Sequence, residues 1–68
     1  MSDELIVRLR EERAARGWTQ AELAERIGVS RKTINTVENG VFVPSTVLAL
    51  KLAKAFGTSV EALFALSE

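Results

Sequence analysis

The sequence predicts an all-α domain of five short helices. Apolar residues recur at the three- to four-residue spacing of helices, and no stretch shows the alternation of a strand. Glycines and hydroxyl-bearing residues then divide the chain at positions suited to helix ends. The 68 residues leave room for one domain, 1–68, with a thin stability margin.

The first helix is expected from about Asp3 to Arg16, with Ser2 as its N-cap. Its inward side would carry Leu5, Ile6 and Leu9. Gly17 would end it, since glycine readily takes the left-handed conformation that closes helices.

The second helix begins after Thr19, and Glu22 three residues later completes a capping box. It closes at Gly28, with Leu23, Ala24 and Ile27 buried. The third runs from about Arg31 to Glu38 behind the cap Ser30, and Ile34 and Val37 face inward.

The fourth helix follows the cap Ser45 and ends at Phe56 and Gly57, with Leu48, Leu52, Ala53 and Phe56 inward. The last helix begins at Thr58 or Ser59. Thr58 has Glu61 at capping-box spacing, whereas Ser59 lies nearer the apolar residues Val60, Leu63 and Phe64, which complete the core.

Composition argues against several classes of protein. Cysteine, histidine and tyrosine are absent, so thiolate metal sites and disulfides are excluded and an enzyme is disfavoured. No cofactor or metal is expected. No apolar run reaches the roughly 20 residues of a membrane span, and Asp3 and Glu4 stand where a signal peptide carries positive charge. We therefore expect a cytoplasmic protein.

Charge is unevenly distributed although the formal net charge is zero. The middle of the chain is basic: its five cations Arg26, Arg31, Lys32, Lys51 and Lys54 face a single carboxylate, Glu38. Both ends are acidic. Because a duplex responds to the face that it meets, this pattern permits DNA binding but predicts weak non-specific affinity.

The second and third helices carry the spacing of a helix-turn-helix. Two helices that cross steeply through a short turn need a small residue at their close approach, which suits Ala24, and a flexible turn residue, which suits Gly28. Apolar side chains would pin one side of the third helix, namely Val29, Ile34 and Val37. The alternative, a plain helical hairpin, would account for these apolar positions but not for Ala24 and Gly28.

The stretch from Leu9 to Gly40 resembles the Cro/C1-type (XRE-like) helix-turn-helix family. It contains Arg-Gly-Trp-Thr-Gln, Gly-Val-Ser and Glu-Asn-Gly, and Pro44-Ser45 and the segment from Leu50 to Phe64 also fit. The resemblance implies a five-helix lambda-repressor-like domain that binds double-stranded DNA.

The resemblance also implies roles for single residues. Arg31, Lys32, Thr36 and the adjacent Asn35 would face bases in the major groove, where arginine and lysine can reach guanine acceptors. Phosphate contacts are expected from Gln20, Ser30, Thr33 and Asn39. Ser30 would first serve as a helix cap.

Arg13 and Glu38 resemble a buried ion pair of the family that would aim the third helix, although both could instead be exposed charges of little energetic value. Trp18 is expected in the core. Val41-Phe42-Val43 could pack under the fourth helix, contact DNA or face a partner, and Val41 stands where many relatives carry a basic residue.

We expect a sequence-specific regulator, most simply a repressor, acting as a homodimer on a near-palindromic operator. Relatives pair through their C-terminal helix, which suggests Leu63, Phe64 and Leu66 as the dimer interface. The alternative is a protein-interaction module, such as an antitoxin, for which DNA binding is secondary.

Overall fold

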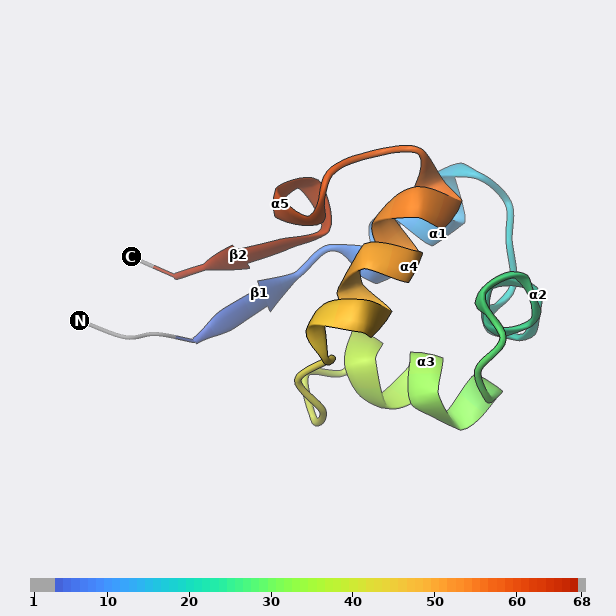
Figure 1. Ribbon diagram of the computed structural model, residues 1–68, viewed down its shortest axis with the longest axis horizontal. Helices are drawn as coiled ribbons and strands as arrows, with labels where there is room; N and C mark the ends of the chain where they lie inside the picture. The colour runs from blue at the N-terminus through green and yellow to red at the C-terminus, as the bar shows by residue number, and fades with distance from the viewer. Residues whose placement is uncertain (1–3, 68) are drawn as a thin grey trace.

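Five helices and a two-stranded antiparallel sheet make up the computed structural model, which describes residues 4–67 (Figure 1). In chain order they are β1 (Leu5–Val7), α1 (Leu9–Ala15), α2 (Gln20–Ile27), α3 (Arg31–Glu38), α4 (Thr46–Phe56), α5 (Val60–Leu63) and β2 (Phe64–Leu66). The expectation of a mostly helical domain is confirmed. No helix in the described part of the chain is both long and apolar enough to cross a bilayer.

Hydroxyl side chains begin four of the helices. Each accepts a hydrogen bond from the backbone N–H three residues further on, and these caps are Thr19, Ser30, Ser45 and Ser59. Thr19 and Glu22 form the complete capping box that the sequence predicts. Ser59, rather than Thr58, caps α5.

The first helix is shorter than the sequence predicts. Instead of starting near Asp3, α1 begins at Leu9, and Leu5–Val7 forms β1. The expected cap Ser2 lies outside the described residues. β1 pairs with β2 so that Ile6 lies opposite Ala65. This pairing, with partners at the two ends of the described chain, overrides the local helical spacing of the apolar residues.

The core gathers apolar side chains from all five helices and from the start of β2. The inward positions expected in the second, third and fourth helices are buried, as are Leu9, Leu63 and Phe64. Leu5 is half-buried against the core, whereas Ile6 is exposed. Of the three residues expected at a dimer interface, Leu63 and Phe64 are buried within the single chain and Leu66 is exposed.

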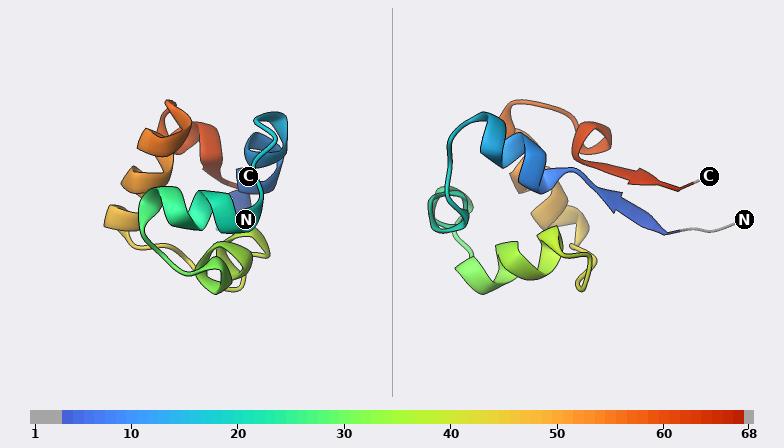
Figure 2. Two further views of the ribbon diagram at one scale, coloured as in Figure 1. Left: turned by 90° about the vertical axis from the view of Figure 1, so that its right-hand side faces the viewer. Right: turned by 180° about the vertical axis from the view of Figure 1, so that it is seen from behind.

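The helix-turn-helix lies at the end of the molecule opposite the paired strands (Figure 1). Gly28 closes α2 in the left-handed conformation, with φ of +73°, and permits the sharp turn into α3. In both views of Figure 2, α3 lies along the lower edge of the molecule, and in the left view α2 lies in front, above it. The outer side of α3 is therefore open to a large ligand.

Candidate nucleic-acid interface

The two sides of α3 differ in exposure. Ile34, Val37 and Glu38 are buried, whereas Arg31, Lys32 and Asn35 are exposed. Ser30 Oγ accepts the Thr33 N–H at 3.1 Å and fixes the start of the helix. The periodicity of α3 thus turns the side chains expected to meet bases outward.

Arg31, Lys32 and Asn35 line one surface hollow of about 290 Å³. Within residues 4–67 neither cation makes an ion pair or a side-chain hydrogen bond. Two cations in the first turn of a helix are unfavourable against the helix dipole. A polyanion on this side of α3 would offset that cost.

Glu38, at the end of α3, is the centre of a buried polar cluster. Its side chain is 0% exposed, and Arg13, which is 16% exposed, donates to it from Nε at 2.7 Å and from Nη2 at 3.2 Å. Arg13 also donates to the Trp18 carbonyl at 2.8 Å. The ion pair proposed from sequence is therefore present and ties α1, the turn before α2 and α3 together.

Two further donors reach the same carboxylate. Gln20 Nε2 lies 3.0 Å from Glu38 Oε1, and Arg10 Nε lies 3.4 Å from the same atom. Burial alone raises the pKa of the Glu38 carboxyl, but the hydrogen bonds from Arg13 and Gln20, the charge of Arg13 and the hydrogen bond from Arg10 outweigh it. The pKa of Glu38 is consequently below its usual value. Arg10 was not predicted to join this cluster, although it lies one helical turn before Arg13 on the same face.

The cluster extends to residues on the open side of α3. Gln20 Nε2 donates to Asn35 Oδ1 at 3.2 Å, and Asn39 Nδ2 donates to the same oxygen at 3.3 Å. Arg10 Nη2 donates to Asn39 Oδ1 at 2.7 Å. Gln20 and Asn39, both expected to contact phosphate, are thus hydrogen-bonded within the protein, and both protons of the Gln20 amide are already used.

The hydroxyl groups of α3 are also engaged. Ser30 Oγ and Thr33 Oγ1 are 2.9 Å apart, and Thr36 Oγ1 donates to the Thr33 carbonyl at 2.9 Å. Thr36, Thr33 and Ser30 line a second hollow with Lys32 and Phe42. Because its proton is committed, the Thr36 hydroxyl can only accept from a further partner.

The loop after α3 turns its apolar side chains outward. Val41, Phe42 and Val43 are all exposed, so they do not pack under α4. The backbone N–H groups of Val41 and Phe42 donate to the Thr36 carbonyl at 3.0 and 3.3 Å and terminate α3. Their exposure argues against packing under α4, and Phe42 lies beside α3 around the same hollow as Lys32 and Thr36.

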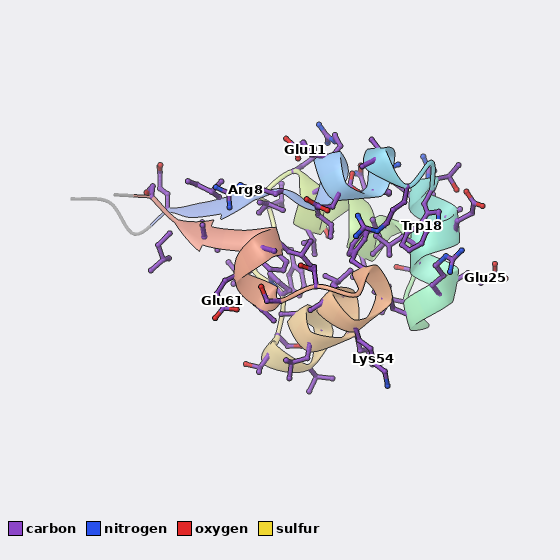
Figure 3. All side chains as sticks on the ribbon, turned by 90° about the horizontal axis from the view of Figure 1, so that it is seen from above. Arg8, Glu11, Trp18, Glu25, Lys54 and Glu61 are labelled. Atoms are coloured by element: carbon purple, nitrogen blue, oxygen red, sulfur yellow. The ribbon has the colours of Figure 1, made fainter. Side chains whose placement is uncertain are left out.

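An aromatic cluster holds α2 against α4. Trp18, at the junction of α1 and α2, stacks on Phe56 with ring centroids 5.3 Å apart (Figure 3). The Arg26 guanidinium lies 4.1 Å from the Trp18 ring, and Arg16 lies over Phe56 at 4.7 Å and donates to its carbonyl at 2.8 Å. Trp18 is partly buried and packs against the core, as expected, and the contact fixes the scaffold behind α3.

Comparison with known proteins agrees with this geometry. The helix-turn-helix family model matches residues 9–63. The chain is 44% identical over 61 residues to YgzD of Bacillus subtilis, described as an uncharacterized HTH-type transcriptional regulator, covering 90% of this chain and 92% of that protein. It is 48% identical over 61 residues to another uncharacterized HTH-type transcriptional regulator, from Methanothermobacter thermautotrophicus, covering 88% of each.

Among solved structures, the restriction-modification controller protein C.AhdI of Aeromonas hydrophila superposes with a TM-score of 0.75 at 41% identity, over 79% of this chain and 82% of that one. These relatives are regulators rather than enzymes. The chain belongs to the Cro/C1-type (XRE-like) helix-turn-helix family of DNA-binding transcriptional regulators.

Proposed function

We propose that this regulator is a repressor that binds a near-palindromic operator as a homodimer, each copy placing α3 in the major groove. Arg31, Lys32, Asn35 and Thr36 face the bases, and the half-sites lie about 34–36 Å apart, one turn of the duplex. A repressor bound in this way would act in the cytoplasm, where its operator lies.

The observation that carries the proposal is the open side of α3. Arg31 and Lys32 are exposed, have no acidic partner among residues 4–67 and lie beside Asn35 around a single hollow. The opposite side of α3 is held by the core and by Glu38. Because the backbone of α3 is already ordered, only the exposed Arg31 and Lys32 side chains lose conformational entropy when they enter a groove.

Phosphate contacts would come from groups that the internal cluster leaves available. The backbone N–H groups of Gln20 and Ala21 open α2 and have no acceptor within the helix. They suit a phosphate oxygen at the helix N-terminus. The Gln20 side chain would then position α2 rather than bind phosphate directly.

The proposed dimer interface shifts to exposed apolar residues. Leu66 on β2 and Val47 and Leu50 on α4 are each more than half exposed. An apolar hollow of about 240 Å³ between the strands, α4 and α5 adjoins them, lined by residues including Leu5, Val43 and Leu50. Phe64 also lines this hollow, so the proposed surface keeps Phe64 and Leu66 and adds Val47 and Leu50.

Titration of a random-sequence duplex at low and at moderate salt tests DNA binding. We expect affinity to fall with salt, and the double variant Arg31→Ala/Lys32→Ala to bind more weakly than the natural chain. Lys51→Ala/Lys54→Ala removes the same charge from α4, where Lys54 points away from the helices (Figure 3), and is the matched control. Salt-independent binding, or equal losses in the two variants, would contradict the proposal.

The exposed loop favours one alternative function. Val41, Phe42 and Val43 present apolar surface next to α3, which suits a protein partner of the kind an antitoxin binds. A tight heteromeric complex recovered on purification, together with a loss of DNA binding in that complex, would support the alternative. A homodimer that binds DNA alone would support the repressor.

A further inference from the structure

The orientation of the Asn35 amide is determined by two separate chains of hydrogen bonds. An asparagine side chain can donate through Nδ2 and accept through Oδ1, and an unconstrained one can pair with adenine through both. Asn35 is exposed on α3, next to Arg31 and Lys32. The groups around it decide which atom faces outward.

The first chain starts at Glu38. Its pKa is lowered, so the carboxylate is ionised near neutral pH and can only accept. Gln20 must therefore turn Nε2, not Oε1, toward Glu38, at 3.0 Å. The second proton of that nitrogen points to Asn35, 3.2 Å away, which must present its oxygen.

The second chain starts at Arg10, which can only donate. Arg10 Nη2 lies 2.7 Å from Asn39, so Asn39 must turn Oδ1 toward the guanidinium. Its Nδ2 then faces Asn35 at 3.3 Å. Asn35 must again present its oxygen. The Glu38 carboxylate, which only accepts, and the Arg10 guanidinium, which only donates, therefore impose the same orientation on Asn35 independently.

The hydrogen bonds from Gln20 and Asn39 occupy both lone pairs of Asn35 Oδ1. Its Nδ2 has no hydrogen-bond partner among residues 4–67. We infer that Asn35 reads the major groove as a donor only, selecting an acceptor (guanine O6 or N7, adenine N7 or thymine O4) and disfavouring cytosine, whose edge there offers only an amino group. This inference rests on the proposed placement of α3 in the major groove.

The neighbours of Asn35 strengthen the same preference. Arg31 and Lys32 are also donors without acceptor capacity, and they line the hollow that Asn35 lines. A base edge entering that hollow meets donors from all three side chains. Because guanine offers two adjacent acceptors in the major groove, the half-site opposite the start of α3 should be rich in guanine.

Selection of bound duplexes from a random pool tests the inference with the full chain and Asn35→Asp. The aspartate keeps one oxygen for Gln20 and Asn39 and presents its second oxygen outward, which replaces a donor by an acceptor. We expect one position of each half-site to change from a base with a major-groove acceptor to cytosine, which offers only its donating amino group there. An unchanged consensus, or cytosine at that position for the natural chain, would overturn the inference.

Base analogues give a second measurement that leaves the protein unaltered, in case Asn35→Asp binds DNA too weakly for selection. The guanine at that position is replaced by 7-deazaguanine or 2-aminopurine, or the thymine by a pyrimidinone lacking O4. The natural chain should lose at least about fivefold in affinity for one such duplex, and Asn35→Ala should lose nothing further. Equal losses for the two proteins would contradict the inference.

The two proposals fail in different ways. If the natural chain selects no duplex and its binding does not depend on salt, the proposed function fails. If it selects a consensus that neither Asn35→Asp nor the base analogues affect, α3 binds DNA but Asn35 does not read it. Thermal unfolding of each variant shows whether a changed consensus comes from a folded protein.

Discussion

Different kinds of contact stabilise the helix-turn-helix and the paired terminal strands. α2 and α3 are fixed by directional contacts: side-chain caps, a left-handed glycine and the buried Glu38 with its donors. β1 and β2 are joined by a three-residue ladder between the two ends of the described chain, with Leu5 opposite Leu66. Directional contacts set an orientation, whereas a short ladder mainly closes the fold.

This difference suits the roles of the two regions. Reading bases requires side chains held within fractions of an ångström, and the cluster around Glu38 reaches Asn35 through Gln20 in two hydrogen bonds. The strands instead carry exposed apolar side chains, including Ile6 and Leu66. Such a surface tolerates adjustment and suits contact with another protein. The predictions below test whether the two regions are separable.

Arg13→Ala should have the largest effect. It leaves the fully buried Glu38 carboxylate without its main partner, which typically costs about 3–5 kcal/mol in the free energy of unfolding. Urea unfolding measures the loss. Arg10→Ala is the control, because Arg10 is 56% exposed and its ion pair is longer, so a loss of no more than about 1 kcal/mol is expected. Similar losses in the two variants would mean that the cluster is not centred on Arg13.

Acidification should weaken the same cluster. The folded-state pKa of Glu38 lies below its usual value of about 4.5, so as pH falls the unfolded chain binds a proton first. The stabilisation is therefore complete above the unfolded pKa and is lost as pH falls through the lower folded value. Urea unfolding between about pH 6 and pH 3 should show this decline, and Glu38→Gln should flatten it.

Glu22 provides a comparison for the acid response, because hydrogen bonds from the backbone and then the side chain of Thr19 also lower its pKa. It is exposed at the start of α2, where solvent screens its interactions, so Glu22→Gln should flatten the decline less than Glu38→Gln. If Glu22→Gln had the larger effect, the capping box rather than the buried cluster would control acid stability.

Loss of a helix cap should separate stability from DNA binding. Ser30→Ala removes the cap of α3 and should cost about 0.5–2 kcal/mol. Ser59→Ala removes the matching cap of α5, near the strands, and should cost no more. Only Ser30→Ala should also weaken duplex binding in a titration. If Ser59→Ala weakened binding equally, the two regions would be coupled.

The local character of the helix-turn-helix explains why the sequence alone predicted it well. The caps Thr19 and Ser30, the turn glycine Gly28 and the buried face of α3 are all encoded by neighbouring residues. The Arg13–Glu38 pair required family resemblance, because it joins residues 25 positions apart. The hydrogen bonds of Gln20 and Asn35 could not be foreseen, because they depend on the angle between α2 and α3.

The strands were missed for the opposite reason. Leu5, Ile6 and Leu9 fit the spacing of a helix, and nothing near Leu5 in the sequence indicates a partner at Leu66. In this pairing Phe64 lies opposite Val7 and is buried. Leu66, opposite Leu5, is the exposed apolar residue of β2. Local periodicity identifies apolar residues but does not say which of them a distant strand will cover.

Leu66→Ala should have the smallest effect on stability and the clearest effect on assembly. Leu66 is 65% exposed, and its cross-strand pair with Leu5 is worth about 0.2–1 kcal/mol, so the monomer should remain folded. If β2 contributes to the dimer interface, sedimentation at micromolar concentration should show a larger monomer fraction.

Ile6→Ala is the matched control, because side chains alternate along a strand and Ile6 points to the face of the ladder opposite Leu5 and Leu66. Weakened association only in Leu66→Ala would assign one face of the strands to the partner copy. Equal weakening would mean that association depends on the ladder itself, and no change in either variant would remove the strands from the dimer interface.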